Sequence, residues 1–217
     1  MKTLIVSGGR INSDFALSYC RNERFDQIIG VDRGLEFLYE NNILPTYVVG
    51  DFDSADPKLE SYYRKQKEIE VRWFNPVKDS TDTQIAIELA LELNSASIVI
   101  LGGTGSRLDH VLGNIQSMML ARDAGVDCIL LDEYNRIRLI SEDTIIKKNQ
   151  QYGRFVSLIP LTSTVEGVDL IGFKYPLHNH TFTSTGSAGL GVSNEVMEEE
   201  AVIHMKSGIL VLIESLD

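Results

Sequence analysis

The sequence predicts an α/β fold with an N-terminal, mostly parallel sheet that has helices on both faces, followed by a C-terminal all-β, sandwich-like domain. Up to residue 135, apolar runs of strand length alternate with segments of helical period, a rhythm typical of parallel sheets with helical crossovers. Beyond that point, short strand-like runs follow one another between Gly, Pro, Asn and Ser. We therefore expect an α/β domain at residues 1–135 and a β-rich domain at residues 136–217.

The composition limits the class of protein. The 217 residues are 43% hydrophobic and 24% charged, as in globular proteins with a sizeable core. The net charge of -11 argues against a nucleic-acid-binding protein, which needs a basic face. Cys20 and Cys128 lack metal-ligand spacing, so we expect free thiols in a reducing compartment. Without a signal-peptide pattern or an apolar run of membrane-spanning length, we expect a cytoplasmic protein with no membrane partner.

Each element of the first domain has a local signal in the sequence. The apolar runs predict strands at residues 4–6, 27–32, 47–51, 71–74, 97–101 and 126–131. Asn12 or Ser13 suits the N-cap of a helix that runs to about Asn22, and Pro57 suits the first position of another helix. Further helices are predicted at residues 34–42, 81–94 and 108–124. The last of these has one apolar stripe, made of Leu108, Val111, Leu112, Ile115 and Met119.

The second domain has strand signals only. Strand-like runs occupy residues 136–141, 154–160, 165–172, 201–206 and 209–214. Ser207-Gly208 separates the last two runs, which predicts a β-hairpin.

The stretch Val48-Val49-Gly50-Asp51-Phe52-Asp53-Ser54 ends a predicted strand with two carboxylates. Because side chains alternate along an extended chain, Asp51 and Asp53 point the same way. Two such charges repel by about 4 kcal/mol at about 4 Å and an effective dielectric of about 20. A hard divalent cation such as Mg²⁺ favours carboxylate oxygens and would offset this repulsion. A solvated turn in which Ser54 caps the next helix is the alternative.

Ligands of parallel sheets gather beyond the carboxyl ends of the strands, and two further segments there have suitable groups. Asp32 closes the second strand, although by itself it reads equally well as a helix N-terminus. Lys78-Asp79-Ser80-Thr81-Asp82-Thr83 leads into a helix, whose free N–H groups suit phosphate or carboxylate. Capping explains one or two residues of this segment, but not Lys78 beside the hydroxyls and carboxylates.

The segment Gly102-Gly103-Thr104-Gly105-Ser106-Arg107-Leu108-Asp109-His110 joins a buried strand to a helix. Glycines allow backbone amides to approach an anion, and Arg107 is a bidentate phosphate donor. The segment is neither a Walker loop nor a dinucleotide fingerprint. Asp109 and His110 lie off the apolar stripe, so core packing does not explain them. Together these strand ends fit metal-assisted phosphoryl transfer.

Three stretches, Val49-Gly50-Asp51-Phe52-Asp53-Ser54, Lys78-Asp79-Ser80-Thr81-Asp82 and Gly105-Ser106-Arg107-Leu108-Asp109-His110, resemble thiamine pyrophosphokinase (thiamine diphosphokinase) in their order and spacing. Gly191-Val192-Ser193-Asn194-Glu195 is similar to the thiamine-site segment of that family. The resemblance implies Mg²⁺-dependent transfer of the pyrophosphoryl group of ATP to the thiamine hydroxyl, which gives thiamine diphosphate and AMP. It also implies a homodimer with active sites between subunits.

The resemblance also implies roles for individual residues. Its candidate metal ligands are Asp51, Asp53 and Asp82, which with Asp109 are also its candidate catalytic residues. Its candidate ATP contacts are Asp32, Lys78, Asp79, Thr81, Arg107 and His110. Its candidate thiamine contacts are Ser193 and Asn194. Asp82 and Asp109 remain unranked as acceptors of the hydroxyl proton. Asp32-Arg33-Gly34 departs from the family's frequent Asp-Gly-Gly, so Arg33 is either an extra phosphate contact or a solvated substitution.

Two other functions remain open at this point. A phosphatase of the haloacid dehalogenase type also uses an Asp-x-Asp strand end, but that pair follows the first strand and needs Thr or Val where this chain has Ala55. A non-catalytic nucleotide sensor would have no reason to keep so many carboxylates of the kind that bind metal.

Overall fold

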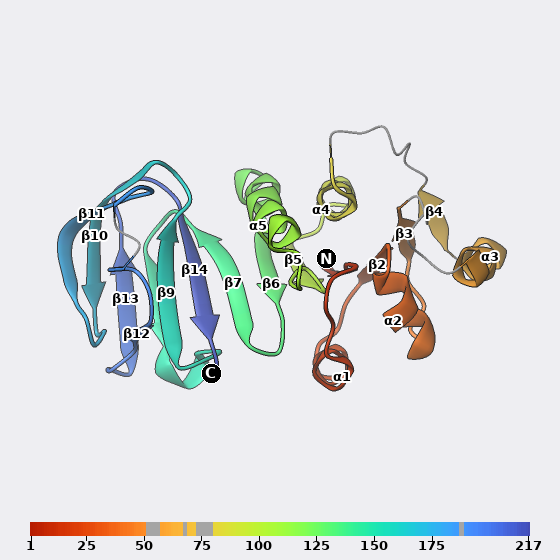
Figure 1. The fold of residues 1–217 in the computed structure, drawn as a ribbon, viewed down its shortest axis with the longest axis horizontal. Helices are drawn as coiled ribbons and strands as arrows, with labels where there is room; N and C mark the ends of the chain where they lie inside the picture. Colours follow the sequence, from red (N-terminus) through yellow and green to blue (C-terminus); the bar gives the residue numbers. More distant parts are fainter. Residues whose placement is uncertain (51–56, 67–68, 73–79, 187–188) are drawn as a thin grey trace. The chain divides into compact units, whose positions relative to one another are not determined.

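The chain folds into two compact units, Met1–Glu133 and Tyr134–Asp217. The computed structural model describes residues 1–50, 57–66, 69–72, 80–186 and 189–217 (Figure 1). The first unit mixes strands and helices and the second consists almost wholly of strands, which confirms the predicted fold class. None of the described helices is long and apolar enough to cross a membrane.

The first unit is a parallel sheet with strands in the order β6-β5-β1-β2-β3-β4. Its strands are β1 (Lys2–Val6), β2 (Gln27–Val31), β3 (Tyr47–Val49), β4 (Glu70–Arg72), β5 (Ser97–Leu101) and β6 (Asp127–Leu131). Its helices are α1 (Ser13–Asn22), α2 (Gly34–Glu40), α3 (Pro57–Lys65), α4 (Asp82–Glu92) and α5 (Leu108–Asp123). In Figure 1, α4 and α5 lie on one face of the sheet and α1 and α2 on the other. The order of strands reverses at β1, because β1 pairs with β2 on one side and with β5 on the other.

The structure confirms the predicted cap of α1 but contradicts the predicted apolar stripe of α5. Asn12 caps α1 as expected, since its Oδ1 accepts from the Phe15 N–H at 3.1 Å. The prediction of an apolar inward stripe on α5 is wrong, because two of its members, Leu108 and Leu112, are 71% and 63% exposed. The buried positions of α5 are instead Asn114, Met118 and Ala121. Asn114 fixes this orientation, since its side-chain amide donates to the Gly103 carbonyl at 2.8 Å and so faces inward.

The second unit is a sandwich of two antiparallel sheets, β12-β9-β14-β7 and β11-β10-β13-β8. The strands of the first are β7 (Asn135–Ile140), β9 (Phe155–Pro160), β12 (Asn194–Glu195) and β14 (Leu210–Ser215). Those of the second are β8 (Thr144–Lys147), which leads into the short helix η1 (Lys148–Gln150), β10 (Thr164–Ile171), β11 (Leu177–Thr183) and β13 (Glu200–His204). Leu158 and Leu212 from one sheet pack in the same apolar core as Val168 and Phe182 from the other.

The predicted hairpin at Ser207-Gly208 is wrong. β13 pairs with β10 and β8, whereas β14 pairs with β7 and β9, so the chain passes from one sheet to the other at this turn. Gly208 has a φ of +97°, a conformation that glycine tolerates best. The turn is held by its neighbours, since the Glu166 N–H donates to the Ser207 carbonyl at 3.1 Å. The Ser-Gly signal indicates a reversal of the chain, but not which strands then pair.

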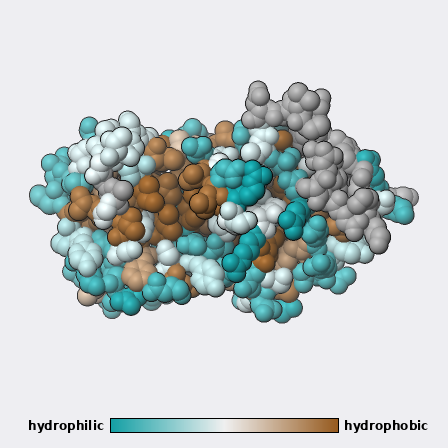
Figure 2. All heavy atoms as spheres, viewed as in Figure 1, coloured by the Kyte–Doolittle hydropathy of each residue, from teal (hydrophilic) through white to brown (hydrophobic). Residues whose placement is uncertain are grey.

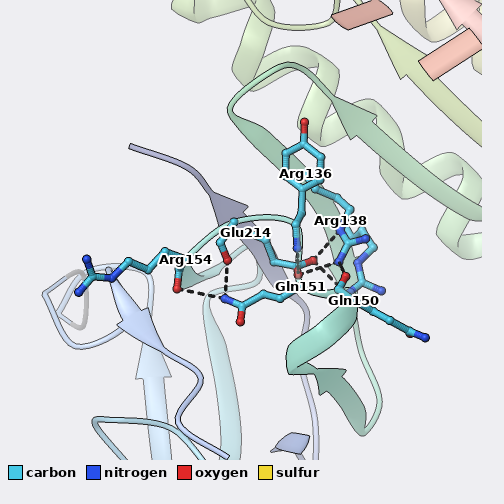
Figure 3. Close-up of polar contacts among 8 residues, drawn as sticks. Arg136, Arg138, Gln150, Gln151, Arg154 and Glu214 are labelled. Atoms are coloured by element: carbon cyan, nitrogen blue, oxygen red, sulfur yellow. Dashed lines mark hydrogen bonds and ion pairs between the residues drawn. The ribbon is translucent and has the colours of Figure 1, made fainter. Parts of the chain in front are cut away.

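A buried carboxylate fastens β14 to β7 in this unit. Glu214 is fully buried and accepts from Arg136 Nε and NH2, both at 2.7 Å, and from the Tyr152 N–H at 3.2 Å (Figure 3). Arg138 NH2 lies 3.5 Å from the same carboxylate. Arg136 also donates to the Gln150 carbonyl at 3.1 Å, so η1 is tied to the same cluster. Burial of a carboxylate without partners would be strongly unfavourable, so the arginines and Glu214 form one structural group.

One cross-strand row on the side of β9, β14 and β7 that faces away from the sandwich core is apolar. Ile159 pairs in register with Val211, which pairs with Leu139, and Ile159 is 43% exposed. Figure 2 shows apolar side chains gathered over the region of these strands.

Candidate functional site

A cavity of about 610 Å³ lies at the carboxyl ends of β1, β2 and β5 in the first unit. Its walls are residues 7–10, 32–33, 81–83 and 102–107, together with three residues of α5 (His110, Val111 and Asn114). β1 and β5 are the neighbours at which the strand order reverses. Open α/β sheets bind their ligands at such a reversal, because the loops there diverge and leave a crevice.

Backbone hydrogen bonds join the loops that follow β1 and β5. The Ser7 N–H donates to the Leu101 carbonyl, the Gly9 N–H to the Gly102 carbonyl and the Arg10 N–H to the Thr104 carbonyl, each at 2.8 Å. A Cβ on Gly9 would collide with the carbonyl oxygens of Thr104 and Gly102. Glycine at this position therefore allows the two loops to approach closely enough to share one surface.

The start of α4 forms another wall of the cavity. Thr81 is the N-cap, and its hydroxyl accepts from the Gln84 N–H at 3.2 Å. Asp82 follows as the first helical residue, and both residues line the cavity. Since the Thr81 hydroxyl already caps the helix, the groups that this segment offers to a ligand are free N–H groups, the positive end of the helix dipole and the Asp82 carboxylate.

Three arginines line the cavity from different loops. The side chains of Arg10, Arg33 and Arg107 are 68%, 65% and 69% exposed. Arg10 NH2 lies 3.1 Å from Glu133 Oε1, and Arg33 Nε lies 4.0 Å from Glu36 Oε2. Guanidinium groups bind phosphate oxygens bidentately, so this arrangement suits a polyanionic ligand in a protein whose net charge is negative.

Arg107 is held by Asp109. Arg107 NH2 donates to Asp109 Oδ2 at 2.5 Å and Nε donates to Oδ1 at 3.3 Å. The hydrogen bonds from Arg107 hold the pKa of the Asp109 carboxyl below its ordinary value, and the nearby His110 backbone acts in the same direction. Asp109 is not among the residues that line the described cavity, whereas His110 is. In this arrangement Asp109 orients the Arg107 guanidinium.

Asp32 lies beside the end of β3. It has a φ of +46°, and a Cβ built on Gly50 would lie 2.7 Å from Asp32 Oδ1. Asp32 and Asp82 both line the cavity, and Asp51 follows Gly50 in the sequence. Oxygen donors of this kind fit Mg²⁺. Among the described residues, no group of three or more His, Cys, Asp or Glu side chains is arranged to hold a metal ion.

Four of the predicted site residues, Asp51, Asp53, Lys78 and Asp79, lie outside the described residues. Of the other first-unit predictions, the structure brings Asp32, Thr81, Asp82, Arg107 and His110 to the same cavity.

Ser193 and Asn194 belong to the second unit. Ser193 is exposed with a φ of +59°, and its N–H donates to the buried Ser157 hydroxyl at 3.1 Å. Asn194 is 4% exposed, and its amide bonds both backbone groups of Tyr175, with Oδ1 accepting at 3.0 Å and Nδ2 donating at 2.8 Å. Asn194 thus holds the turn at Tyr175, while Ser193 presents its side chain to solvent.

Sequence reasoning missed three polar residues of the cavity, Ser7, Arg10 and Asn114. Asn114 had a usable signal, since it is an amide between apolar positions of a helix and such a residue often bonds a loop carbonyl. Arg10 had none, because nothing in the sequence places the loop after β1 beside the loop after β5.

Comparison with known proteins identifies the family. Residues 20–130 match the family model described as "Thiamin pyrophosphokinase, catalytic domain", and residues 143–210 match "Thiamin pyrophosphokinase, vitamin B1 binding domain". The thiamine pyrophosphokinase of Bacillus subtilis (strain 168) is 34% identical over 218 residues, which cover 100% of both chains. The chain belongs to the thiamine pyrophosphokinase family.

Solved structures of thiamine pyrophosphokinases have the same fold over the whole chain. The crystal structure of the Bacillus subtilis enzyme superposes with a TM-score of 0.88 at 32% identity, with full coverage of both chains. That of Geobacillus thermodenitrificans gives a TM-score of 0.84 at 29% identity, covering 100% of this chain and 98% of the other. The catalytic-domain match includes every wall of the cavity except the loop at residues 7–10, and the vitamin B1 binding match includes Ser193 and Asn194.

Proposed function

We propose that this member of the thiamine pyrophosphokinase family is a thiamine diphosphokinase that transfers the pyrophosphoryl group of MgATP to the hydroxyl of thiamine. The observation that supports this most directly is the cavity at the β1/β5 reversal, with arginines from three loops and the start of α4 in its walls. A triphosphate needs this combination of backbone N–H groups and bidentate cations.

In the proposed reaction the thiamine hydroxyl oxygen attacks the β-phosphorus of ATP. The bond from that phosphorus to the oxygen bridging it to the α-phosphate breaks, and AMP leaves with the electron pair. Arg10, Arg33 and Arg107 bind the phosphate oxygens and offset the charge that develops on them. The joined loops at residues 7–10 and 102–105 fix where the phosphates lie, because their backbones are bonded to each other.

The hydroxyl proton passes to a carboxylate or to water. Asp82 lines the cavity and Asp109 is hydrogen-bonded to Arg107, and both remain candidates for this role. A general base must also reach the proton that it accepts.

We propose that Asp32 and Asp82, together with the predicted ligands Asp51 and Asp53, hold Mg²⁺. The ion would neutralise phosphate charge and orient the triphosphate when bound. Lys78, Asp79, Thr81 and His110 remain predicted ATP contacts.

For the second substrate, we propose that Ser193 contacts thiamine and that Asn194 acts by holding the turn at Tyr175. The expected homodimer with active sites between subunits, and the cytoplasmic location, are part of the same proposal.

Incubation of the protein with ATP, Mg²⁺ and thiamine tests the function, with products separated by anion-exchange chromatography. Equal amounts of AMP and thiamine diphosphate support the proposal. Free phosphate without thiamine diphosphate would indicate a phosphatase instead, and unchanged ATP would indicate a nucleotide sensor. Asp82→Asn is expected to reduce kcat at least about a hundredfold, as does loss of a general base or metal ligand.

A further inference from the structure

Two buried hydroxyl pairs connect β1 to the two ends of α4. At one end of β1, Thr3 Oγ1 lies 2.6 Å from Ser95 Oγ, just beyond the C-terminus of α4. Four residues further on, Ser7 Oγ lies 2.6 Å from Thr83 Oγ1, in the first turn of α4. All four residues are buried, with exposures of 0%, 4%, 5% and 7% for Thr3, Ser95, Ser7 and Thr83. The two pairs have the same chemistry, length and burial.

Only the Ser7–Thr83 pair lies at the cavity. Both of its residues line the cavity, and neither Thr3 nor Ser95 does. Ser7 begins the glycine loop after β1, and its N–H is bonded to the end of β5. Thr83 follows the cap residue Thr81 and Asp82. The bond between the two hydroxyls therefore joins two walls of the cavity, the glycine loop and the start of α4.

We propose that Ser7 and Thr83 are positioning residues, whose hydrogen bond sets the distance between the glycine loop and the N-terminus of α4 and thereby the fit of the ATP triphosphate. This inference rests on the proposed function, since it assigns the triphosphate to this cavity. Neither hydroxyl needs to touch the nucleotide. Both hydroxyls are buried and one donates to the other, so the pair holds two walls at a fixed separation.

Geometry is the reason that such a pair affects binding. The glycine loop places Arg10 at the cavity and α4 offers its first backbone N–H groups, and these donors bind one ligand together only at matching distances. A small displacement of one wall weakens several hydrogen bonds at once, and misplacement by about 1 Å reduces rates by about a hundredfold in other enzymes. The Thr3–Ser95 pair also ties β1 to α4, but at the far end of the helix.

The Thr3–Ser95 pair is the matched control for a set of variants. We would compare Ser7→Ala, Thr83→Val and their double variant with Thr3→Val, Ser95→Ala and their double variant. Removal of one hydroxyl leaves its partner buried without a bond, whereas removal of both is nearly neutral. Each single variant is therefore expected to lower Tm by about 3–6 °C, and each double variant to regain much of that loss.

Measurement of nucleotide affinity should distinguish the Ser7–Thr83 pair from the Thr3–Ser95 pair. We expect the Kd of a non-hydrolysable ATP analogue with Mg²⁺, measured by calorimetry, to rise about fivefold to tenfold in all three Ser7/Thr83 variants. The double variant should stay weak even where its Tm recovers, because the walls are no longer joined. The control variants should bind the analogue as the wild type does. In turnover assays, KM for ATP should rise in the Ser7/Thr83 variants while KM for thiamine stays constant. Thr83→Ser keeps the hydroxyl, so it should have the Kd for the analogue and the KM for ATP of the wild type.

The inference is overturned if the Ser7/Thr83 variants bind the analogue as tightly as the wild type, or if both pairs weaken binding equally. Analogue binding needs no turnover. A wild-type protein that binds the analogue but forms no thiamine diphosphate would therefore refute the proposed reaction and leave the positioning role intact.

Discussion

Gly9→Ala tests whether the two loops of the cavity are joined as described. A Cβ at this position would collide with the carbonyl oxygens of Gly102 and Thr104. Those two oxygens accept the Gly9 and Arg10 N–H groups at 2.8 Å, so the methyl group can be accommodated only if the loops separate. The variant thus removes the contact between the loops without changing any charge.

The size of the effect follows from the bonds that are lost. Each backbone hydrogen bond contributes about 1 kcal/mol, and displacement of the carbonyl groups adds to this, so we expect a loss of about 2–4 kcal/mol in the free energy of unfolding. For a protein of this length, such a loss lowers Tm by about 5–12 °C. KM for ATP should rise at least about tenfold, since the surface that would hold the phosphates is no longer assembled.

Gly113→Ala is the control. Gly113 lies within α5, and no heavy atom lies within 4 Å of a Cβ placed there. Alanine should therefore stabilise the helix by about 0.5–1 kcal/mol. The assays are thermal unfolding followed by circular dichroism and initial rates of AMP formation. A Gly9→Ala protein with the Tm and the KM for ATP of the wild type would refute the close approach of the loops.

Three further predictions concern charges. Arg10→Gln should raise KM for ATP about tenfold through loss of a charge-assisted phosphate bond. The control Arg122→Gln removes an arginine that pairs with its neighbour Asp123 and should leave initial rates unchanged. Equal effects of the two substitutions would contradict a specific contact between Arg10 and ATP. Glu214→Gln should reduce the free energy of unfolding, measured in urea, by about 3 kcal/mol, because two arginines then lose their buried carboxylate. Substitution of the exposed Glu200 by Gln is the control and should change this free energy by less than about 0.5 kcal/mol. The Asn179 backbone and the nearby His178 hold the pKa of the Asp169 carboxyl below its ordinary value. Its stabilisation is therefore fully present above the unfolded pKa of about 3.9 and is lost as the pH falls through the folded pKa. Asp169→Asn should accordingly lose less stability than the wild type as the pH falls from about 4 to about 2, and an equal loss would contradict this account.

Local signals in the sequence predicted the first unit well. Asn12 and Thr81 are caps, Pro57 begins α3, and each predicted strand up to β6 is present in the sheet. These features depend on a few neighbouring residues, which a single sequence contains. The stripe on α5 was wrong because the inward face of that helix is decided by a distant carbonyl, that of Gly103, and not by hydrophobicity alone.

The second unit was harder to predict because its strands depend on their partners. β11 has the mostly polar sequence Leu177–Thr183, and Phe182 is its one fully buried side chain in the described structure. Its backbone pairs with β10, which contributes Val165, Val168 and Leu170 to the core. The turn at Gly208 likewise gave no information on which sheet each flanking strand joins.

The same limit applies to the cavity. The sequence indicated the segments at Thr81 and Arg107, because glycines, hydroxyls and charges cluster there. The loop at residues 7–10 became visible only from the strand order, which puts β1 beside β5 although nearly a hundred residues separate Lys2 from its partner Ser97. Pairing between strands so far apart in the chain cannot be predicted from the residues next to either strand.

The place of β14 has a consequence for the order of folding. β7 and β9 both pair with β14, and the bond register joins Asn135 to Ser215 across almost the whole second unit. Neither strand gains this neighbour until residues 210–215 are available, so the sheet closes late and through distant contacts, which are slow to form. A chain that stops at Ile209 would leave the facing edges of β7 and β9 open, and open apolar edges recruit other chains. Loss of one short strand would thus turn this fold into a nucleus for aggregation.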